Sequence, residues 1–418
     1  MSFPRIAAAC SAGLLILAMP AFATAATPTT PKAAPAAPAA ASAVAAVPTT
    51  PLQAALLQAV PPPQLDARSW LVTDLTSGQI LAESNAHEQI APASLTKLMT
   101  AYITFKALKD GTIKRDQMVS EPLEAYHTGG SRMFVDPKVP VSIDDLLMGM
   151  IVQSGNDAAM TLAYAVGGST STFVGMMNQQ AQQWHLKGTH FVDPTGLPDP
   201  NHHTTAYDLS VIAAHIIDDF PEDYARYFKV KKFTYNKITQ PNRVSLLFTD
   251  PTVDGMKTGY TQEAGYCMIT SAQRNTPSGP RRILSVVIGT PSEHARVADS
   301  QALLTWAYQN SEDVVLAQAN KPMANVRVWK GTASTVGLGE SRPIVITVPR
   351  GSAKNLQTKV VPPKALVAPV QAGQAIGTLQ VDVSGKQIGS YPLHALSAVP
   401  QAGFVGRTWD SLRMMFAK

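Results

Sequence analysis

The clearest hydrophobic pattern in the chain follows Ser94, where apolar residues recur at spacings of three and four up to Leu108. Pro92 precedes this run, and no Gly or Pro interrupts it before Gly111. The spacing predicts a helix that begins near Ser94. Lys97 then lies one turn after Ser94 on the same face of the helix.

Further apolar runs predict strands before this helix and near the middle of the chain. The predicted strands lie at residues 69–74, 79–82, 253–261, 266–271 and 283–288, with 253–261 at a sheet edge. Helical periodicity predicts additional helices at residues 141–152, 157–166, 208–217 and 293–308. Helices between two groups of antiparallel strands are typical of an α+β domain.

Short polar residues fall in the connection between two of these helices. Ser142, with Asp145 three residues later, predicts an N-cap for residues 141–152. Ser154-Gly155-Asn156 then separates this helix from residues 157–166. We expect so tight a connection to direct the Ser154 and Asn156 side chains into a cleft.

After Asn320 the pattern changes to short alternating strands separated by Pro and Gly, without a catalytic motif. These predicted strands lie at residues 326–329, 344–348, 356–361, 375–383 and 386–393. They predict a small β-sandwich-like domain. Residues 404–418 predict a terminal helix with one apolar stripe, formed by Phe404, Val405, Trp409, Leu412, Met415 and Phe416. Such a helix either binds a membrane interface or packs on its own domain.

The N-terminal segment is typical of an exported protein. Arg5, an apolar run at residues 12–18 and Ala23-Thr24-Ala25 predict a signal peptide that is too short for a confident membrane span. Cys10 would leave with it, so that Cys267 alone remains and no intramolecular disulfide is possible. The predicted organisation is a signal peptide (1–26), an Ala/Pro-rich disordered spacer (27–63), a catalytic domain (64–315), a β domain (316–399) and an amphipathic helix (400–418).

Composition excludes several classes of function. The net charge of +5 is mild and spread out, which suits an acidic cell wall or anionic lipid better than nucleic acid. No Gly-rich phosphate loop or His-Glu-x-x-His pattern occurs, and His202-His203 lie in a Pro/Asn/Asp-rich loop. We therefore predict no metal and no cofactor. Cys267 lies in an apolar strand and is predicted to fill the core.

Three short motifs carry the candidate chemistry. By itself, Ser94-x-x-Lys97 is more typical of a capping serine and a solvated lysine than of a catalytic pair. However, Ser154-x-Asn156 and Lys257-Thr258-Gly259 follow it in order, and each of the three patterns occurs once in the chain. A serine needs a neighbouring base to become a nucleophile. A lysine can be that base only if burial or a second cation keeps it neutral.

In this order the motifs resemble those of the low-molecular-mass penicillin-binding proteins, the serine-type D-alanyl-D-alanine carboxypeptidases of peptidase family S11. The similarity covers residues 65–415 and is strongest in the blocks 90–100, 151–158 and 253–261. It implies a penicillin-binding-protein/β-lactamase-like transpeptidase domain, followed by a small β domain and a C-terminal amphipathic helix.

The resemblance also implies roles for the acylation residues. Ser94 would attack the carbonyl between two terminal D-alanines, and Lys97 would accept its proton. Ser154 would relay a proton to the leaving amine, while Asn156 would hold the substrate backbone and the Lys97 ammonium. The backbone N–H groups of Ser94 and Tyr260 would form the oxyanion hole.

Other residues would bind the substrate carboxylate. The resemblance implies this role for Lys257 and Thr258, with Lys257 as the second cation that keeps Lys97 neutral. Arg296 matches an arginine that contributes to carboxylate binding in the family, whereas a structural role is favoured for Arg243. The chain departs from the family pattern at Val244, where Asn is more usual, and at Tyr260, where many relatives carry His.

The implied partners are peptidoglycan stem peptides ending in D-Ala-D-Ala, with β-lactam antibiotics as covalent inhibitors and a role in cell-wall biogenesis. The terminal helix would attach the protein to the periplasmic, anionic face of the inner membrane. Three alternatives share the motifs: a DD-endopeptidase, a β-lactamase and a non-catalytic wall-binding protein. A class A β-lactamase needs a glutamate after its second motif, and Glu222 is the only Glu between Asn156 and Lys257.

Overall fold

The computed structural model describes residues 60–383 and 385–416. The predicted signal peptide, Cys10 and most of the predicted spacer lie outside the described residues.

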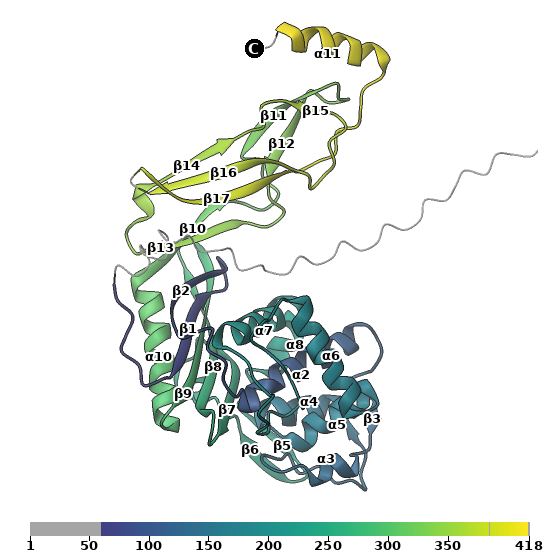
Figure 1. The fold of residues 1–418 in the computed structure, drawn as a ribbon, viewed down its shortest axis with the longest axis vertical. Helices are drawn as coiled ribbons and strands as arrows, with labels where there is room; N and C mark the ends of the chain where they lie inside the picture. Colours follow the sequence, from purple (N-terminus) through teal and green to yellow (C-terminus); the bar gives the residue numbers. More distant parts are fainter. Residues whose placement is uncertain (1–59, 384, 417–418) are drawn as a thin grey trace, which may run out of the picture. The chain divides into compact units, whose positions relative to one another are not determined.

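A five-stranded antiparallel sheet forms the centre of the first domain (Figure 1). The strand order is β2-β1-β9-β8-β7, so that β7 is an edge strand as predicted. The strands are β1 (Ser69–Asp74), β2 (Gln79–Ser84), β7 (Val253–Thr261), β8 (Gly265–Thr276) and β9 (Gly279–Thr290). The five strands predicted from the sequence are therefore all present.

Both faces of this sheet are buried, because successive side chains of a strand point to opposite faces. Leu71 and Val286 belong to the core shared with the helices that follow Ser94. Their neighbours Val72 and Val287 belong to a second core, shared with residues of α10 (Glu293–Asn310) such as Leu303. The domain thus consists of a sheet between a large group of helices and one long helix.

The group of helices begins with a 3₁₀ turn, η1 (Ala93–Thr96), and not with an α-helix as the periodicity predicted. Ser94 lies in this turn, and the α-helix starts at Lys97. The helices of this group are α2 (Lys97–Lys109), α3 (Leu123–His127), α4 (Ile143–Val152), α5 (Asn156–Gly167), α6 (Thr170–Gln183), α7 (Ala206–Asp219) and α8 (Pro221–Tyr227). The short helix α9 (Leu246–Thr249) instead buries Leu246 and Leu247 in the second core, which is shared with α10. Two short strand pairs, β3 (Met118–Val119) with β4 (Val141–Ser142) and β5 (Lys232–Tyr235) with β6 (Ile238–Pro241), complete the domain.

Helix α6 was not predicted from the sequence. It buries Phe173, Met177 and Ala181, which are spaced four residues apart. The Ser169 hydroxyl caps its N-terminus by accepting a hydrogen bond from the Thr172 N–H. A capping serine followed by this spacing was the available signal.

Among the described residues from 311 to 395, the second domain has strands and a short 3₁₀ turn, η2 (Ala353–Asn355), as its regular elements. Six strands pair in the order β14-β16-β17-β12-β11-β15, and β10 pairs with β13. The strands are β10 (Ser311–Ala317), β11 (Ala324–Trp329), β12 (Thr335–Gly339), β13 (Ile344–Pro349), β14 (Leu356–Val361), β15 (Leu366–Val367), β16 (Ala375–Val383) and β17 (Lys386–Ala395). Strands β10, β12 and β15 were not predicted. The predicted domain boundary at residue 315 falls within β10.

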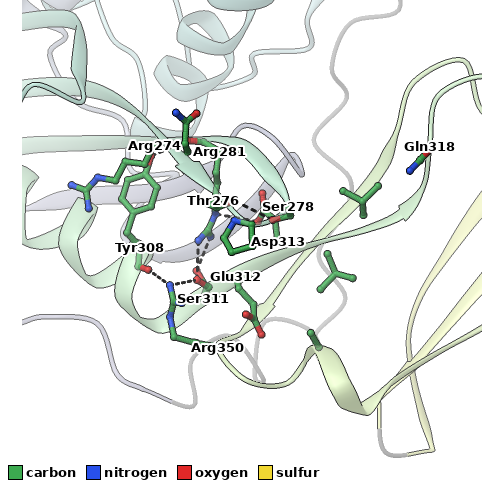
Figure 2. Close-up of a pocket in the computed structure, with 15 residues that line it drawn as sticks. Arg274, Thr276, Ser278, Arg281, Tyr308, Ser311, Glu312, Asp313, Gln318 and Arg350 are labelled. Carbon is green, nitrogen blue, oxygen red and sulfur yellow. Dashed lines mark hydrogen bonds and ion pairs between the residues drawn. The ribbon is translucent and has the colours of Figure 1, made fainter.

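A buried ion cluster lies where α10 leads into β10 (Figure 2). The Arg281 guanidinium is paired with Asp74 at 2.6 Å and with Asp313 at 3.1 Å. It also donates hydrogen bonds to the carbonyl and hydroxyl of Ser311, each at 2.8 Å. A cavity of about 770 Å³ is lined by Arg281 and Asp313, together with Tyr308. We call Asp74, Arg281 and Asp313 the junction cluster.

The C-terminal helix α11 (Phe404–Phe416) is present as predicted. None of its residues is buried. Its Asp410 carboxylate accepts a hydrogen bond from the Lys330 N–H at 2.6 Å, which ties the helix to the β domain. Within residues 60–383 and 385–416, no helix combines the length and apolar character required to cross a membrane.

Candidate active site

The first pair of the site is Ser94 with Lys97. The Lys97 ammonium lies 2.9 Å from the Ser94 hydroxyl oxygen and 2.6 Å from the carbonyl oxygen of Thr195. Because Ser94 is in the 3₁₀ turn and Lys97 is the first residue of α2, both side chains share one face. Lys97 is 1% exposed, so that its amine is shielded from water.

The second pair is Ser154 with Lys257. The Lys257 ammonium donates hydrogen bonds to the Ser154 hydroxyl and to the carbonyl of Thr258, each at 2.8 Å. Ser154 has a φ of 66°, a left-handed conformation that L-residues rarely adopt and that is often found at functional sites. The strained turn between α4 and α5 thus directs a serine hydroxyl toward the edge strand β7.

Glycine at position 259 permits a close approach of β7 to the nucleophile turn. A Cβ atom there would lie 3.2 Å from the Ala93 Cβ and 3.3 Å from the Leu95 Cγ. The backbone of β7 therefore passes directly beside the turn that carries Ser94. This packing brings the predicted oxyanion donors, the N–H groups of Ser94 and Tyr260, onto neighbouring segments.

The pKa of Lys97 is lowered to about 7, chiefly by burial and also by the charge of Arg243, while Asp193 and Asp157 oppose the shift. Burial, followed by the charge of Lys97, lowers the pKa of Lys257 well below its ordinary value. From the sequence, burial and a second cation, Lys257, were both expected to keep Lys97 neutral. In the structure, removal from water is the larger cause.

Asn156 lies beside these residues, as the first residue of α5 and not in the connection before it. Its Nδ2 donates a hydrogen bond to the Gly129 carbonyl at 2.6 Å. Its Oδ1 is buried and has no hydrogen-bond partner among the described residues, so that the predicted contact with the Lys97 ammonium is not formed. The adjacent Asp157 carboxylate accepts hydrogen bonds from the N–H groups of Met133 and of the two residues that follow it.

The predicted carboxylate-binding residues lie around β7. Thr258 and Arg296 are buried, and Arg296 Nη1 lies 3.5 Å from the Gly259 carbonyl. Arg296 also pairs with Glu293, at 2.5 Å. Arg243 forms no ion pair with any described carboxylate, and burial together with the charge of Arg296 lowers its pKa. Two lysines and two arginines thus share a region whose negative charges include those of Asp193, Asp157 and Glu293.

Tyr260 follows the third motif and is 54% exposed. Its ring lies against that of Tyr266, with centroids 4.3 Å apart. The Arg296 guanidinium lies over Tyr266, at 5.6 Å from the ring centroid. This chain therefore presents an aromatic pair beside the cationic residues.

Sequence reasoning missed the segment that lies beneath Lys97. Thr195 supplies the carbonyl that Lys97 contacts, and the buried His202 contacts the hydroxyl of Thr96 at 3.0 Å. Both belong to the loop between α6 and α7, about a hundred residues from the first motif. The Pro/Asn/Asp-rich composition of this segment indicated a loop, but it did not indicate that the loop packs against the first motif.

Comparison with known proteins agrees with this geometry. Residues 57–292 match the peptidase S11 family of D-alanyl-D-alanine carboxypeptidases, and residues 312–401 match the C-terminal domain of penicillin-binding protein 5. The chain is 41% identical to the D-alanyl-D-alanine carboxypeptidase DacC of Escherichia coli, over 88% of this chain and 92% of the relative. It is also 41% identical to DacA of Haemophilus influenzae, over 84% of this chain and 90% of that protein.

Solved structures give the same result. The crystal structure of penicillin-binding protein 5 from Haemophilus influenzae has a TM-score of 0.77 and 40% identity, and it covers 82% of this chain and 100% of its own. The ampicillin-bound penicillin-binding protein D2 of Listeria monocytogenes has a TM-score of 0.54 and 28% identity, covering 59% of this chain and 99% of its own.

The fold and the site thus define a penicillin-binding protein with an N-terminal peptidase domain and a C-terminal all-β domain. The chain belongs to the D-alanyl-D-alanine carboxypeptidases of peptidase family S11.

Proposed function

We propose that this carboxypeptidase removes the terminal D-alanine of peptidoglycan stem peptides through an acyl-enzyme on Ser94. The observation that carries the proposal is the 2.9 Å contact between the Ser94 hydroxyl and Lys97, whose pKa burial lowers to about 7. A substantial fraction of Lys97 is therefore neutral near pH 7 and able to accept the serine proton. Ser94 Oγ then bonds to the carbonyl carbon, the peptide C–N bond breaks, and D-alanine leaves with a proton.

We infer that Ser154 and Lys257 deliver that proton to the leaving amine. The Ser154 hydroxyl accepts a hydrogen bond from Lys257 and can turn its own proton toward the cleft. A positioned relay of this kind typically contributes roughly 10²–10⁴-fold in rate. Water subsequently hydrolyses the Ser94 ester and restores the free hydroxyl.

The developing oxyanion is assigned to the backbone N–H groups of Ser94 and Tyr260. The close packing of Gly259 on the turn from Pro92 to Leu95 supports this assignment, because it sets the two segments side by side. Losing one such donor typically costs about 3 kcal/mol of transition-state stabilisation. The unpartnered Oδ1 of Asn156 is available to accept a hydrogen bond from the substrate backbone.

We assign the binding of the substrate carboxylate to Lys257, Thr258 and Arg296. Arg243 lies in the same region. Burial lowers the pKa values of Lys257 and Arg243, and repulsion by neighbouring cations, Lys97 for Lys257 and Arg296 for Arg243, lowers them as well. A carboxylate among them relieves that repulsion and favours the protonated form of Lys257. This electrostatic mismatch supports the proposal that the site selects a substrate with a free C-terminus.

The test is D-alanine release from a peptide ending in D-Ala-D-Ala, compared between the wild type and Ser94→Ala. We expect release by the wild type and a loss of at least about 10³-fold in the variant, because no other group can form the ester. A second substrate with the terminal carboxylate amidated should be cleaved poorly by the wild type. Undiminished release by Ser94→Ala would contradict the assignment of the nucleophile.

We also propose that the chain is exported and that α11 binds the outer face of the inner membrane. The large apolar residues of its stripe are all more than half exposed, whereas Asp410 faces the β domain. A helix that is held by its polar side and exposes aromatic residues suits a membrane interface. Deleting residues 403–418 should move the protein to the soluble fraction. A truncated protein that remains with membranes would contradict the anchor.

A further inference from the structure

The turn of residues 193–196 is pressed against the nucleophile segment. Its Pro194 carbonyl accepts a hydrogen bond from the Thr100 hydroxyl at 2.7 Å, and its Thr195 carbonyl contacts Lys97 at 2.6 Å. Gly196 has a φ of 85°, and a Cβ atom there would lie 1.7 Å from the Ala93 carbonyl oxygen. Position 196 therefore requires glycine, because the two backbones leave no space for a side chain between them.

Asp193 holds this turn in shape. Its Oδ1 accepts hydrogen bonds from the Thr195 hydroxyl and the Gly196 N–H, each at 2.7 Å, and from the Thr195 N–H. Burial alone would raise the pKa of Asp193, but His202 and the hydrogen bonds from Thr195 lower it to about 2. The carboxylate is therefore ionised wherever the enzyme works.

His202 connects Asp193 to the nucleophile segment. One ring nitrogen lies 3.0 Å from the Thr96 hydroxyl, between Ser94 and Lys97 in the chain. The other ring nitrogen lies 3.7 Å from Asp193 Oδ2. Both His202 and Thr96 are buried, so that these contacts are shielded from water.

We propose that Asp193 and His202 form a positioning unit for Lys97. Asp193 fixes the Thr195 carbonyl that orients the Lys97 amine, and its carboxylate adds a negative charge to the surroundings of that amine. His202 fixes Thr96 and therefore the turn between the nucleophile and its base. The inference rests on the proposed role of Lys97 as the base.

The charges facing Lys97 make a specific prediction possible. Asp193 and Asp157 favour the ammonium form, whereas Arg243 and the neighbouring Lys257 disfavour it. An asparagine at position 193 keeps an oxygen that can accept the three hydrogen bonds and removes only the charge. The pKa of Lys97 should then fall, so that the base is free at lower pH.

The experiment measures the rate constant of acylation by benzylpenicillin from pH 5 to pH 9, by intact-protein mass at short times. In Asp193→Asn, the acidic limb of the profile should move to lower pH by about one unit. Asp199→Asn is the matched control, because Asp199 lies in the same loop and its carboxylate accepts a hydrogen bond only from the N–H of nearby Asn201 among the described residues. The backbone carbonyl of Asp199, which accepts a hydrogen bond from the His202 N–H, is unchanged in this variant. Its limb should coincide with that of the wild type.

A second pair of variants tests His202 independently. His202→Leu removes the contact with Thr96, and we expect the acylation rate constant to fall by about tenfold or more while non-covalent penicillin binding is retained. His202→Gln keeps a polar group within reach of Thr96 and should recover part of the loss. Equal losses in the Leu and Gln variants would contradict a positioning role for the imidazole.

Different results would overturn the positioning unit and the proposed function. An unmoved acidic limb in folded Asp193→Asn, with wild-type protein acylated on Ser94, would overturn the positioning unit alone. A penicilloyl adduct on Ser94→Ala would overturn the proposed function itself.

Discussion

The active site and the junction cluster both bury charges that are not balanced, but the imbalance has opposite signs. At the junction, the single guanidinium of Arg281 lies between the carboxylates of Asp74 and Asp313. Burial, followed by the charge of Asp74, raises the pKa of Asp313 to about 7. In the active site the surplus is cationic, and burial lowers the pKa of Lys97 to about 7.

The two regions differ in what surrounds the surplus charge. Arg281 is enclosed by hydrogen bonds to Ser311, and Asp313 accepts one from the Thr347 hydroxyl at 3.0 Å. Lys97 and Lys257 instead contact the serine hydroxyls of the first two motifs. Desolvation alone therefore does not identify a catalytic site. A buried charge becomes catalytic when its partner is a nucleophile and its missing counter-ion can come from the substrate.

The largest effect should follow from removing the base. Lys97→Met keeps the volume of the side chain and should lower the acylation rate constant by about 10³–10⁴-fold. Acylation by benzylpenicillin, followed by intact-protein mass, measures it. Lys106→Met is the control, because Lys106 is an exposed lysine of the same helix. Comparable acylation of Lys97→Met and the wild type would refute the proposed base.

The junction cluster should respond in stability and not in catalysis. Arg281→Met leaves two buried carboxylates without their cation, and breaking a buried pair in this way typically costs about 3–5 kcal/mol of unfolding free energy. Denaturant unfolding measures the loss, with the exposed Lys359→Met as a control expected to stay within about 0.5 kcal/mol. The folded fraction should be acylated at the wild-type rate. A selective loss of acylation would show that the two regions are not separate.

Asp313 should make stability depend on pH. Its pKa is raised from the ordinary 3.8 to about 7, so that the folded state binds more protons than the unfolded state between these values. The unfolding free energy should therefore fall as pH rises from 4 to 7, by on the order of 2 kcal/mol, and level off above. Asp313→Asn should remove this dependence. If the variant and the wild type had identical pH profiles of unfolding free energy, the pH dependence would have to come from other groups.

The smallest change in unfolding free energy is expected for a variant that separates catalysis from stability. Lys257→Met removes a cation that is repelled by Lys97, so that the unfolding free energy should stay unchanged or rise by about 1 kcal/mol. D-alanine release should nevertheless collapse. Thermal unfolding and a release assay on the same preparation test both statements. Destabilisation by several kcal/mol would mean that Lys257 is a structural charge like Arg281.

The sequence was sufficient to predict most of the sheet and to locate three motifs that the structure brings together. The motifs Ser94-x-x-Lys97, Ser154-x-Asn156 and Lys257-Thr258-Gly259 are short patterns that can be recognised without knowledge of the fold, and the roles of their residues stay predictions. Periodicity likewise predicted the strands of the central sheet, because both faces are buried and the apolar runs are long. Cys267 was correctly predicted to fill the core.

Contacts between distant loops could not be predicted in this way. The contacts of Asp193 and His202 with the nucleophile segment depend on how the loop before α7 packs, and no periodic pattern records that. The pairing of Asp74 with Arg281 spans 207 positions, and each residue alone looks like an ordinary surface charge. Strand β10 was missed because Glu312 and Asp313 interrupt its apolar pattern, although the junction cluster buries Asp313.

The central claim, a Ser94 acyl-enzyme, is tested most directly by intact-protein mass after brief exposure to penicillin, for the wild type and Ser94→Ala. The account predicts a persistent penicilloyl adduct on the wild type and none on the variant. An adduct on Ser94→Ala, or a wild type that neither gains mass nor consumes penicillin, would contradict it.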